Sequence, residues 1–238
     1  MPVTLMPSPM STPLSCSLCI VVPVLNEAQG IEALLQSLAP LRQRGARVVV
    51  VDGGSQDDTR ALAQAHADAV IEGPCGRALQ MNAGAALGWG EVLLFLHADT
   101  TLPERADVHL LQALSRGHVW GRFDVRIAGR PWMLAVVARL MNWRSRWTGI
   151  ATGDQAIFVR RDVFAQVGGF ALQPLMEDID LSQRLRAVGP AACLRQRVVT
   201  SGRRWEQRGV WRTILLMWRL RWRYWRGESA HTLARDYR

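Results

Sequence analysis

The sequence predicts an α/β domain in which a central, mostly parallel sheet is covered by helices on both faces. Through the first hundred residues, short apolar runs alternate with segments of helical periodicity, and the connections between them are short. That alternation is typical of a parallel sheet with crossover connections. A chain of 238 residues buries one good core, so we expect one domain.

Four strands are expected in the first half, each an apolar run bounded by turn residues: 19–24, 47–51, 69–72 and 92–96. Three helices lie between them. In the first, apolar residues recur at the spacing of one helix face from Ile31 to Leu38, and Pro40 is expected to end it. The second helix begins near Asp57, and the third spans 76–87.

The second half is less regular. Helices are expected at 103–115, 131–141, 162–166 and 177–188, and strands at 119–127, 153–160 and 192–200. The segment 142–152, rich in Trp and Arg, is expected to be a loop. The chain therefore divides into a disordered lead-in at 1–18, the α/β domain at 19–205, and an Arg- and Trp-rich helical segment at 206–238.

The strand at 92–96 is expected in the middle of the sheet, because five consecutive apolar residues suit a strand buried on both faces. His97, Ala98 and Asp99 follow it, and ligands of open α/β folds bind at this carboxyl edge. In an extended chain His97 and Asp99 point to the same side. Two interpretations stay open: the pair holds a metal ion, or Asp99 caps the next turn, since Thr100, Thr101 and Pro103 look like the start of the helix that continues to residue 115.

Acidic residues also follow the second expected strand and begin a late helix. Asp52 ends the strand at 47–51, and Glu177 and Asp178 open the helix at 177–188. Each has an ordinary explanation, since Asp favours turns and acids favour a helix N-terminus. Together with Asp99, however, they predict a metal site and a carboxylate base, which suit transfer from a phosphorylated donor to a hydroxyl group.

Other classes of nucleotide-binding protein are excluded by their missing signatures. The first strand is not followed by G-x-G-x-x-G, which argues against a dehydrogenase. The chain contains no Lys, so all 29 basic residues are Arg and the phosphate-binding loop that ends in G-K-[ST] is absent. A sugar-phosphate nucleotidyltransferase would carry a Gly-rich, basic signature after its first strand, and VPVLNEAQG lacks it.

The positive charge is concentrated near the C-terminus. The net charge is +9, and 195–238 alone holds 12 Arg against three acids. The helix expected at 211–226 has an apolar face and a basic face beside it, formed by Trp211, Leu215, Trp218, Trp222 and Trp225 and by Arg212, Arg219, Arg223 and Arg226. Two interpretations stay open: the helix lies on an anionic membrane surface, or its Trp face packs on the core while the Arg stems reach solvent. No nucleic-acid recognition fold accompanies the charge, so nucleic acid is not an expected partner.

The N-terminal segment and the cysteines bear on location. Residues 1–18 contain several prolines and no basic stretch, so they are not expected to form a signal peptide. No apolar run approaches the ~20 residues of a membrane-spanning helix. Cys16 and Cys19 form a single C-x-x-C without further zinc ligands at workable spacing, so reduced thiols are expected. The prediction is a cytoplasmic protein, or one bound peripherally to the inner face of the membrane.

Five segments, in this order and spacing, resemble the motifs of family-2 glycosyltransferases: VVPVLNEAQGI, VVVDGGSQDDT, GRALQMNAGAA, LFLHADT and LMEDIDLSQRLR. The resemblance covers about 19–205 and implies the nucleotide-sugar-binding GT-A fold. It further implies a nucleotide-diphosphate sugar donor (UDP favoured over GDP), a divalent cation (Mn²⁺ or Mg²⁺), and a small-molecule or lipid-linked hydroxyl acceptor. Within the family, the chain resembles small bacterial members with HAD in place of D-x-D, encoded beside radical-SAM proteins and in some cases linked to arsenosugar synthesis.

The resemblance also implies a role for each matching residue. The nucleotide pocket would be formed by Pro23, Asn26, Glu27, Asp52, Arg77, Asn82 and Ala98. Asp99 matches the second Asp of D-x-D, which binds the metal, and Asp178 matches the acid proposed as base in inverting members. The acceptor side would be formed by Gly153, Asp154, Gln155, Glu177, Arg204 and Trp205.

His97 departs from the family pattern because it replaces the first carboxylate of D-x-D. A neutral imidazole is a poorer ligand than a carboxylate for Mg²⁺ and a fair one for Mn²⁺. Two roles stay open for His97, a metal ligand or a residue that orients a ligand, and the second is favoured. The alternative to a transferase is a non-catalytic, membrane-associated nucleotide-sugar-binding or scaffold protein. The presence of Asp52, Asp99 and Asp178 together favours the enzyme.

Overall fold

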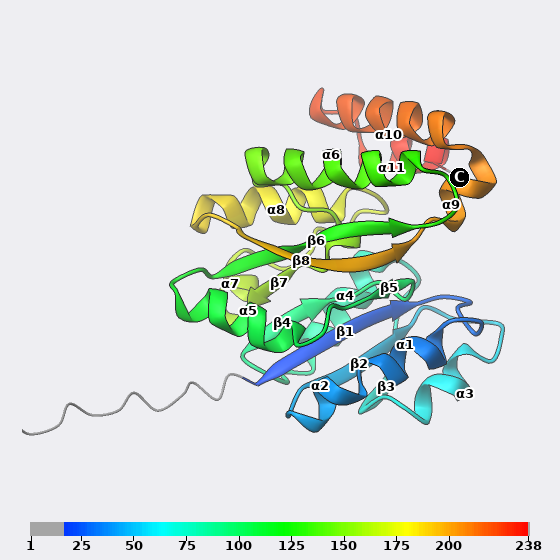
Figure 1. Cartoon of the computed structure of the whole chain (residues 1–238). Helices are drawn as coiled ribbons and strands as arrows, with labels where there is room; N and C mark the ends of the chain where they lie inside the picture. The colour runs from blue at the N-terminus through cyan, green and yellow to red at the C-terminus, as the bar shows by residue number, and fades with distance from the viewer. Residues whose placement is uncertain (1–16, 238) are drawn as a thin grey trace, which may run out of the picture.

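A computed structural model describes residues 17–237, and in that part of the chain eight strands form one sheet (Figure 1). The strands are β1 (Leu18–Val24), β2 (Arg47–Asp52), β3 (Ala69–Glu72), β4 (Val92–Phe95), β5 (Thr100–Thr101), β6 (Trp120–Ala128), β7 (Phe158–Arg160) and β8 (Ala192–Ser201). Their order across the sheet is β3-β2-β1-β4-β7-β6-β8-β5. The predicted lead-in at 1–18 and the C-x-x-C residue Cys16 lie largely outside the described residues.

Within the described residues, helices connect most of the strands, and three more follow the last strand. They are α1 (Ile31–Ser37), α2 (Ala39–Gln43), α3 (Thr59–Gln64), α4 (Arg77–Ala86), α5 (Ala106–Ser115), α6 (Met133–Thr148), α7 (Arg161–Gln166), α8 (Glu177–Val188), α9 (Arg203–Arg208), α10 (Val210–Trp225) and α11 (Ala230–Tyr237), with one 3₁₀ helix, η1 (Gly153–Gln155). As expected, the first helix ends before Pro40, because α1 ends at Ser37. Pro40 itself lies in the first turn of a separate helix, α2, where its missing N–H would have no partner in any case.

The sheet is mostly parallel, as predicted. β1 pairs in parallel with β2 and β4, β2 with β3, and β6 with β8. The exceptions are β7, which is antiparallel to β4 and β6, and the two-residue β5, which is antiparallel to β8. β4 lies between β1 and β7, so the segment before His97 is a central strand.

Alternate residues of the strands belong to two hydrophobic clusters, one on each face of the sheet. Ile20 and Val22 of β1 belong to the cluster packed against α1, α2, α3, α5 and α6. Cys19 and Val21 belong to the cluster packed against α4, α7 and α8. Gly84 lets α4 approach β1 closely, since a Cβ there would lie 2.4 Å from a Val21 methyl carbon. The prediction of a sheet covered on both faces is confirmed.

Three local predictions were wrong. The segment 142–152 is not a loop, because α6 continues to Thr148 and ends only at Gly149, which has a left-handed φ of 67°. No Gly or Pro interrupts the helix before that point, and Trp and Arg are compatible with a helix. The expected strand at 153–160 begins with η1 and becomes extended only at β7. Thr100 and Thr101 do not start a helix, because both pair with β8.

The predicted helix at 211–226 is present as α10, but its tryptophan face does not pack on the core. Trp222 is 56% exposed and Trp225 is 79% exposed, and the other apolar residues of that face lie between these values. The opposite face of α10 is buried instead, and its Leu220 packs against Leu233 of α11 and Ile179 of α8. The core-packing interpretation of the tryptophan face is therefore wrong.

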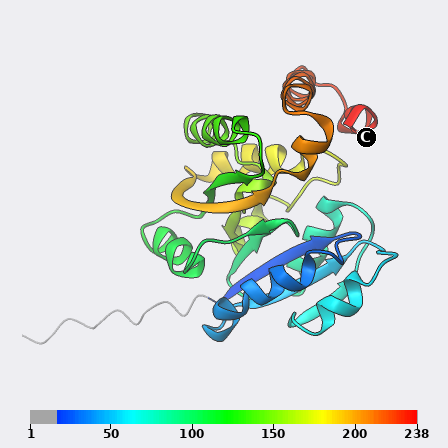
Figure 2. The same cartoon turned by 45° about the vertical axis from the view of Figure 1, so that its right-hand side comes forward.

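Figures 1 and 2 show α10 and α6 on the same side of the molecule, away from α1, α2 and α3. α6 adds exposed aromatic rings there, since Trp143 is 59% exposed and stacks on Trp147 at 5.4 Å between ring centroids. Part of the basic face is already neutralised, because Arg223 forms ion pairs with Glu228 and Asp236. Within the described residues, no helix is both long and apolar enough to cross a membrane.

Candidate active site

The loops that follow β1 and β2 are joined by hydrogen bonds between side chains and backbone. Asn26 has a left-handed φ of 55°, and its backbone N–H donates to Ser55 Oγ at 2.9 Å. Its Oδ1 accepts from the Gln56 backbone N–H at 2.8 Å. The Glu27 N–H donates to Thr59 Oγ1 at 2.8 Å. These contacts hold the predicted nucleotide-pocket residues of both loops in one rim at the carboxyl edge of the sheet.

Asp52 lies buried at the end of β2, within this rim. Its carboxylate accepts hydrogen bonds from the Ser55 backbone N–H at 3.1 Å and from the Ser55 hydroxyl. Gln80 of α4 donates to the carbonyl oxygens of Val24 and Val51, each at 2.8 Å, and so ties the ends of β1 and β2 to α4. Asp52 thus has the turn-forming role that the sequence left open. Its contact with the base of the nucleotide stays a prediction.

The chain turns directly after β4 instead of staying extended. The Thr100 N–H donates to the His97 carbonyl oxygen at 3.0 Å, so the alternation expected for His97 and Asp99 does not hold. Asp99 lines a hollow of about 340 Å³ with Ala98, Glu27 and Arg203 among its neighbours. Glu27 and Arg203, which both line this hollow, form an ion pair at 3.3 Å. The structure therefore brings Asp99, Ala98 and Glu27 together beside an arginine that the sequence did not single out.

His97 faces a different group, the turn formed by η1. Its Nδ1 lies 3.3 Å from Asp154 Oδ1. The backbone of Gly153 comes so close that a Cβ there would lie 2.3 Å from Cε1 of the His97 ring. The Gly153 N–H in turn donates to Asp178 Oδ2 at 2.8 Å. Gly153 thus connects the strand-end histidine with the predicted catalytic acid.

Arg77, at the start of α4, lies among four of the predicted acids. Its Nε is 3.5 Å from Glu177 Oε1. Burial would lower the pKa of Arg77, but the charges of Glu177, Asp178, Asp154 and Asp99 outweigh burial and raise it. The structure therefore brings the metal-side and acceptor-side acids around one guanidinium.

The acids around Arg77 have opposite pKa shifts. Burial and the charge of Asp178 raise the pKa of Glu177, against the opposing charge of Arg77. Burial pushes the pKa of Asp154 upward, but the hydrogen bond from His97 and the charges of His97 and Arg77 lower it below its ordinary value. Within this group Asp154 is held ionised, while Glu177 takes up a proton more readily than a free glutamate.

A metal ion has one well-placed carboxylate here. Among residues 17–237, no three His, Cys, Asp or Glu side chains gather closely enough to form a complete metal site. Mg²⁺ and similar hard cations commonly take one or two protein carboxylates and complete their shell with phosphate oxygens and water. Asp99 fits that donor set, and His97 is turned toward Asp154.

Several predicted residues are engaged by the fold itself. The Asn82 amide exchanges two hydrogen bonds of 2.9 Å with the backbone of Phe170. Gln155 is buried and forms a capping box with Thr152. Pro23 is buried within β1, and Trp205 packs against the core. Their predicted contacts with substrate stay predictions.

Arg204 lies at the edge of the acidic group. Its guanidinium carbon lies 4.7 Å from the ring centroid of Tyr237, and burial together with the charge of Arg77 lowers its pKa.

The sequence did not predict Arg203, Arg144 and Arg221, which also lie near the site. The only signal for them was the density of arginine in their segments.

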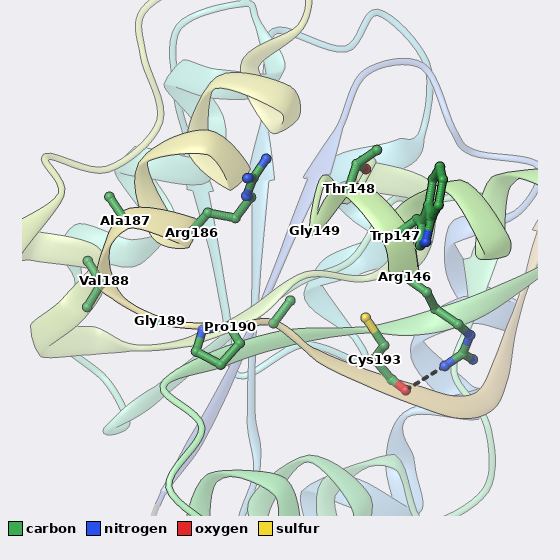
Figure 3. A pocket seen from close by; sticks show the side chains of 11 residues that line it. Arg146, Trp147, Thr148, Gly149, Arg186, Ala187, Val188, Gly189, Pro190 and Cys193 are labelled. Atoms are coloured by element: carbon green, nitrogen blue, oxygen red, sulfur yellow. Dashed lines mark hydrogen bonds between the residues drawn. The ribbon is translucent and has the colours of Figure 1, made fainter.

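A larger hollow lies elsewhere in the described residues. It has a volume of about 480 Å³ and lies between the ends of α6 and α8, with Trp147, Arg186 and Pro190 in its wall (Figure 3). Arg146 reaches across one side and donates to the Cys193 carbonyl oxygen at 3.1 Å (Figure 3). None of the predicted site residues lines it. The acids at the carboxyl edge, not this hollow, define the candidate active site.

Comparisons with known proteins agree with this fold. A model of glycosyl transferase family 2 matches residues 19–172. A PGL/p-HBAD biosynthesis glycosyltransferase of Mycobacterium bovis (strain BCG) is 31% identical over 167 residues, which make up 65% of this chain and 63% of that protein. The chain spans less than two thirds of the length of the curated relatives first matched.

Solved structures show the same fold at low identity. Staphylococcus aureus TarS 1–349, in complex with UDP-GlcNAc, has a TM-score of 0.62 and 16% identity over 78% of this chain and 58% of that chain. Glucosyl-3-phosphoglycerate synthase from Mycobacterium tuberculosis, in complex with Mn²⁺, UDP and glucosyl-3-phosphoglycerate, has a TM-score of 0.59 and 20% identity over 78% and 71%. The likeness confirms the predicted GT-A fold. Because the family model covers more than half of the chain, the protein belongs to glycosyl transferase family 2.

Proposed function

We propose that this protein transfers a sugar from a nucleotide-diphosphate donor to a hydroxyl group of an acceptor. The observation that carries the proposal is the grouping of Asp99, Asp154, Glu177 and Asp178 around Arg77 at the carboxyl edge of the sheet. Membership of family 2 supports a sugar as the transferred group. The alternative, a non-catalytic nucleotide-sugar-binding or scaffold protein, does not require a base and a metal-binding carboxylate in one group.

The donor is proposed to bind in the rim formed by the loops after β1 and β2. Pro23, Asn26, Glu27 and Asp52 lie in this rim or at its base, and Ala98 lines the adjoining hollow. Arg77 would bind the diphosphate, and Asn82 keeps its assigned role as a neighbour of the nucleotide. UDP is the favoured nucleotide because TarS and the glucosyl-3-phosphoglycerate synthase were solved with it, although another neighbour was solved with GDP-Man.

A divalent metal ion is proposed to bind at Asp99, next to the diphosphate. Structural neighbours were solved with Mn²⁺ or Mg²⁺, which supports a metal of this kind. When bound, such a cation would neutralise charge that develops on the departing diphosphate. His97 is proposed to act without touching the metal, by holding Asp154 and the η1 turn in position.

Asp178 is proposed as the catalytic base. It would accept the proton of the acceptor hydroxyl as that oxygen bonds to the anomeric carbon and the bond from that carbon to the diphosphate breaks. One direct displacement of this kind inverts the anomeric configuration. The Gly153 N–H holds Asp178 Oδ2, while Glu177, Asp154, Gln155, Arg204 and Trp205 would surround the acceptor.

The nucleotide site can be tested by calorimetric titration with UDP and with GDP, each in Mn²⁺, Mg²⁺ or EDTA. We expect metal-dependent binding of one nucleotide, lost in Asp99→Ala and retained in Asp178→Ala. The Asp178→Ala variant should also abolish transfer. If the folded wild type binds neither nucleotide under any condition, the scaffold interpretation replaces the enzyme.

The exposed tryptophans of α10 and α6 support a second part of the proposal, peripheral attachment to an anionic membrane. Tryptophan is well suited to the boundary between headgroups and acyl chains, and nearby arginines attract anionic lipids. Arg212 on α10 and Arg226, just after its last residue, are exposed, as are Trp211, Trp222 and Trp225. Such attachment would place the site near a lipid-linked acceptor, whereas a soluble acceptor needs no membrane.

The resemblance to the bacterial subgroup with HAD in place of D-x-D stays a prediction. The structure adds one relevant observation, because His97 contacts Asp154 and Gly153 and so has a defined place in the fold. This supports a specific role for the imidazole, not a decayed metal site.

A further inference from the structure

Two arginines from different helices lie close enough to Asp178 for its charge to act on them. Arg144 lies on α6 and Arg221 on the inner half of α10, and both are partly exposed. The negative charge of Asp178 acts on both, and that of Asp154 acts on Arg221. The charge of Asp99 acts instead on Arg77 and Arg204. The charge of the proposed base therefore acts on both Arg144 and Arg221, whereas that of Asp99 is not among the main influences on either.

Neither guanidinium has an acceptor within the described part of the chain. The Nε and Nη2 atoms of Arg144 and the Nε atom of Arg221 are buried and have no hydrogen-bond partner. Arg122 also has a buried unpaired Nε, but its terminal nitrogens bind Asp124 and the Asn142 carbonyl oxygen. Buried donors of charged groups are strongly disfavoured when they lack an acceptor. The pair thus differs from the other arginine that has a buried unpaired nitrogen.

The two guanidinium groups also repel each other. Burial and the charge of Arg221 lower the pKa of Arg144 to about 10, and burial lowers the pKa of Arg221. Arg144 remains protonated at neutral pH, because a pKa of about 10 lies well above it. A like-charge pair held in place by two packed helices destabilises the fold. An anion bound between the two guanidinium groups would offset their repulsion and supply the hydrogen-bond acceptors that they lack.

We propose that Arg144 and Arg221 bind a phosphate group of the acceptor substrate and thereby position its hydroxyl group at Asp178. The inference rests on the proposed transferase function and adds the class of acceptor, a hydroxyl compound that carries a phosphate. A tetrahedral phosphate offers several acceptor oxygens and can bind two guanidinium groups that come from different directions. The phosphate can belong to a soluble ester or to a lipid headgroup.

The test uses two probes with the same chemistry, after saturation of the full-length protein with UDP and Mn²⁺. The soluble probe is glycerol 3-phosphate, measured by calorimetry. The lipid probe is a phosphatidylcholine vesicle that contains phosphatidylglycerol, measured by co-sedimentation. The test variant is Arg144→Gln with Arg221→Gln. The matched control is Arg116→Gln with Arg235→Gln, which removes the same charge from exposed positions outside the active site and outside the proposed membrane-binding face.

We expect wild type and the control variant to bind one of the two probes. The Arg144/Arg221 variant should bind that probe at least about tenfold more weakly than the control, because it has lost hydrogen bonds from charged groups. Weaker binding of glycerol 3-phosphate indicates a soluble acceptor, and weaker binding of only the vesicle indicates a lipid acceptor. Equal binding by both variants, or no binding of either probe by wild type, overturns the proposal. Binding of UDP with Mn²⁺, measured first, reports separately on the proposed function.

Thermal unfolding provides a readout that does not depend on the ligand. Because the pair is repulsive and unpaired, Arg144→Gln with Arg221→Gln should unfold at the same temperature as wild type or a higher one, as at other sites where function is maintained at the expense of stability. Added glycerol 3-phosphate, if the acceptor is soluble, should stabilise wild type and not this variant. A large loss of stability in the variant without ligand would show that the pair serves the fold.

Discussion

The Nε atom of Arg77 lies 3.5 Å from Oε1 of Glu177, and this ion pair joins the start of α4 to the start of α8. The Glu177 side chain is 5% exposed, whereas that of Arg77 is 40% exposed. The two residues are far apart in the chain. Their contact places the proposed donor side and acceptor side of the site next to each other.

Loss of Arg77 should destabilise the protein through Glu177. In Arg77→Met the buried carboxylate loses its closest positive partner, so we expect a loss of about 1–2 kcal/mol in the free energy of unfolding, less than for a fully buried pair because Arg77 is partly exposed. Urea denaturation at neutral pH measures this change. Arg60→Met is the control, because the Arg60–Glu72 pair is exposed on both sides and should change stability by about 0.5 kcal/mol or less. Equal effects of the two substitutions would contradict a special role for the buried pair.

Glu177 and Asp154 should affect stability in opposite directions as pH changes. The pKa of Glu177 is raised above its ordinary 4.5, so wild type loses stability relative to Glu177→Gln as pH rises through 4.5 toward the raised value. The pKa of Asp154 is lowered below 3.8, so wild type is more stable than Asp154→Asn above 3.8 and loses that advantage as pH falls toward the lowered value.

Denaturation curves collected from about pH 3 to pH 7 measure both differences. The stability of Glu177→Gln relative to wild type should increase with pH, and that of Asp154→Asn should decrease. Two parallel curves would mean that the opposite shifts of these carboxyls are absent in solution.

Gly153→Ala should damage catalysis more than nucleotide binding. A Cβ at this position would lie 2.3 Å from the His97 ring, so the ring or the η1 turn must move. The Gly153 N–H that holds Asp178 would move with it. We expect turnover to fall about tenfold or more, as for misplacement of a catalytic group, with little change in UDP affinity.

Gly189→Ala is the matched control for this substitution. A Cβ there would meet only Val119 at 3.8 Å, which is an ordinary contact. This variant should retain wild-type turnover. If Gly153→Ala is equally active, the contact of His97 with η1 does not position the base.

The tryptophan face of α10 should determine vesicle binding. Replacing Trp218 and Trp225 by Ser removes two exposed rings and should reduce co-sedimentation with phosphatidylglycerol vesicles by about tenfold or more, because each buried ring contributes apolar area. A rise in salt should weaken wild-type binding. The control replaces the exposed apolar residues Leu87 and Leu172 by Ser, away from α10. Unchanged binding in the tryptophan variant would rule out this face as the attachment surface.

The fold was predictable from the sequence where near neighbours decide the structure. The buried runs of β1, β2 and β4 and the helix α8 were recognisable from apolar continuity and helical spacing. The errors came where local patterns were ambiguous. In 142–152 the Trp and Arg residues suggested a loop, yet α6 continues because nothing before Gly149 breaks it. At Thr100 and Thr101 only the distant β8 provides the strand's partner.

The sequence by itself determined the α/β class, the family motifs and the positions of the acids along the chain, because these depend on residue type and short-range spacing. Only the tertiary structure decided that His97 faces Asp154, that Arg77 meets Glu177, and that Arg144 and Arg221 approach Asp178 without a partner. Such contacts join residues far apart in the chain. They depend on how helices and strands pack across the sheet, and no local pattern of residues encodes that packing.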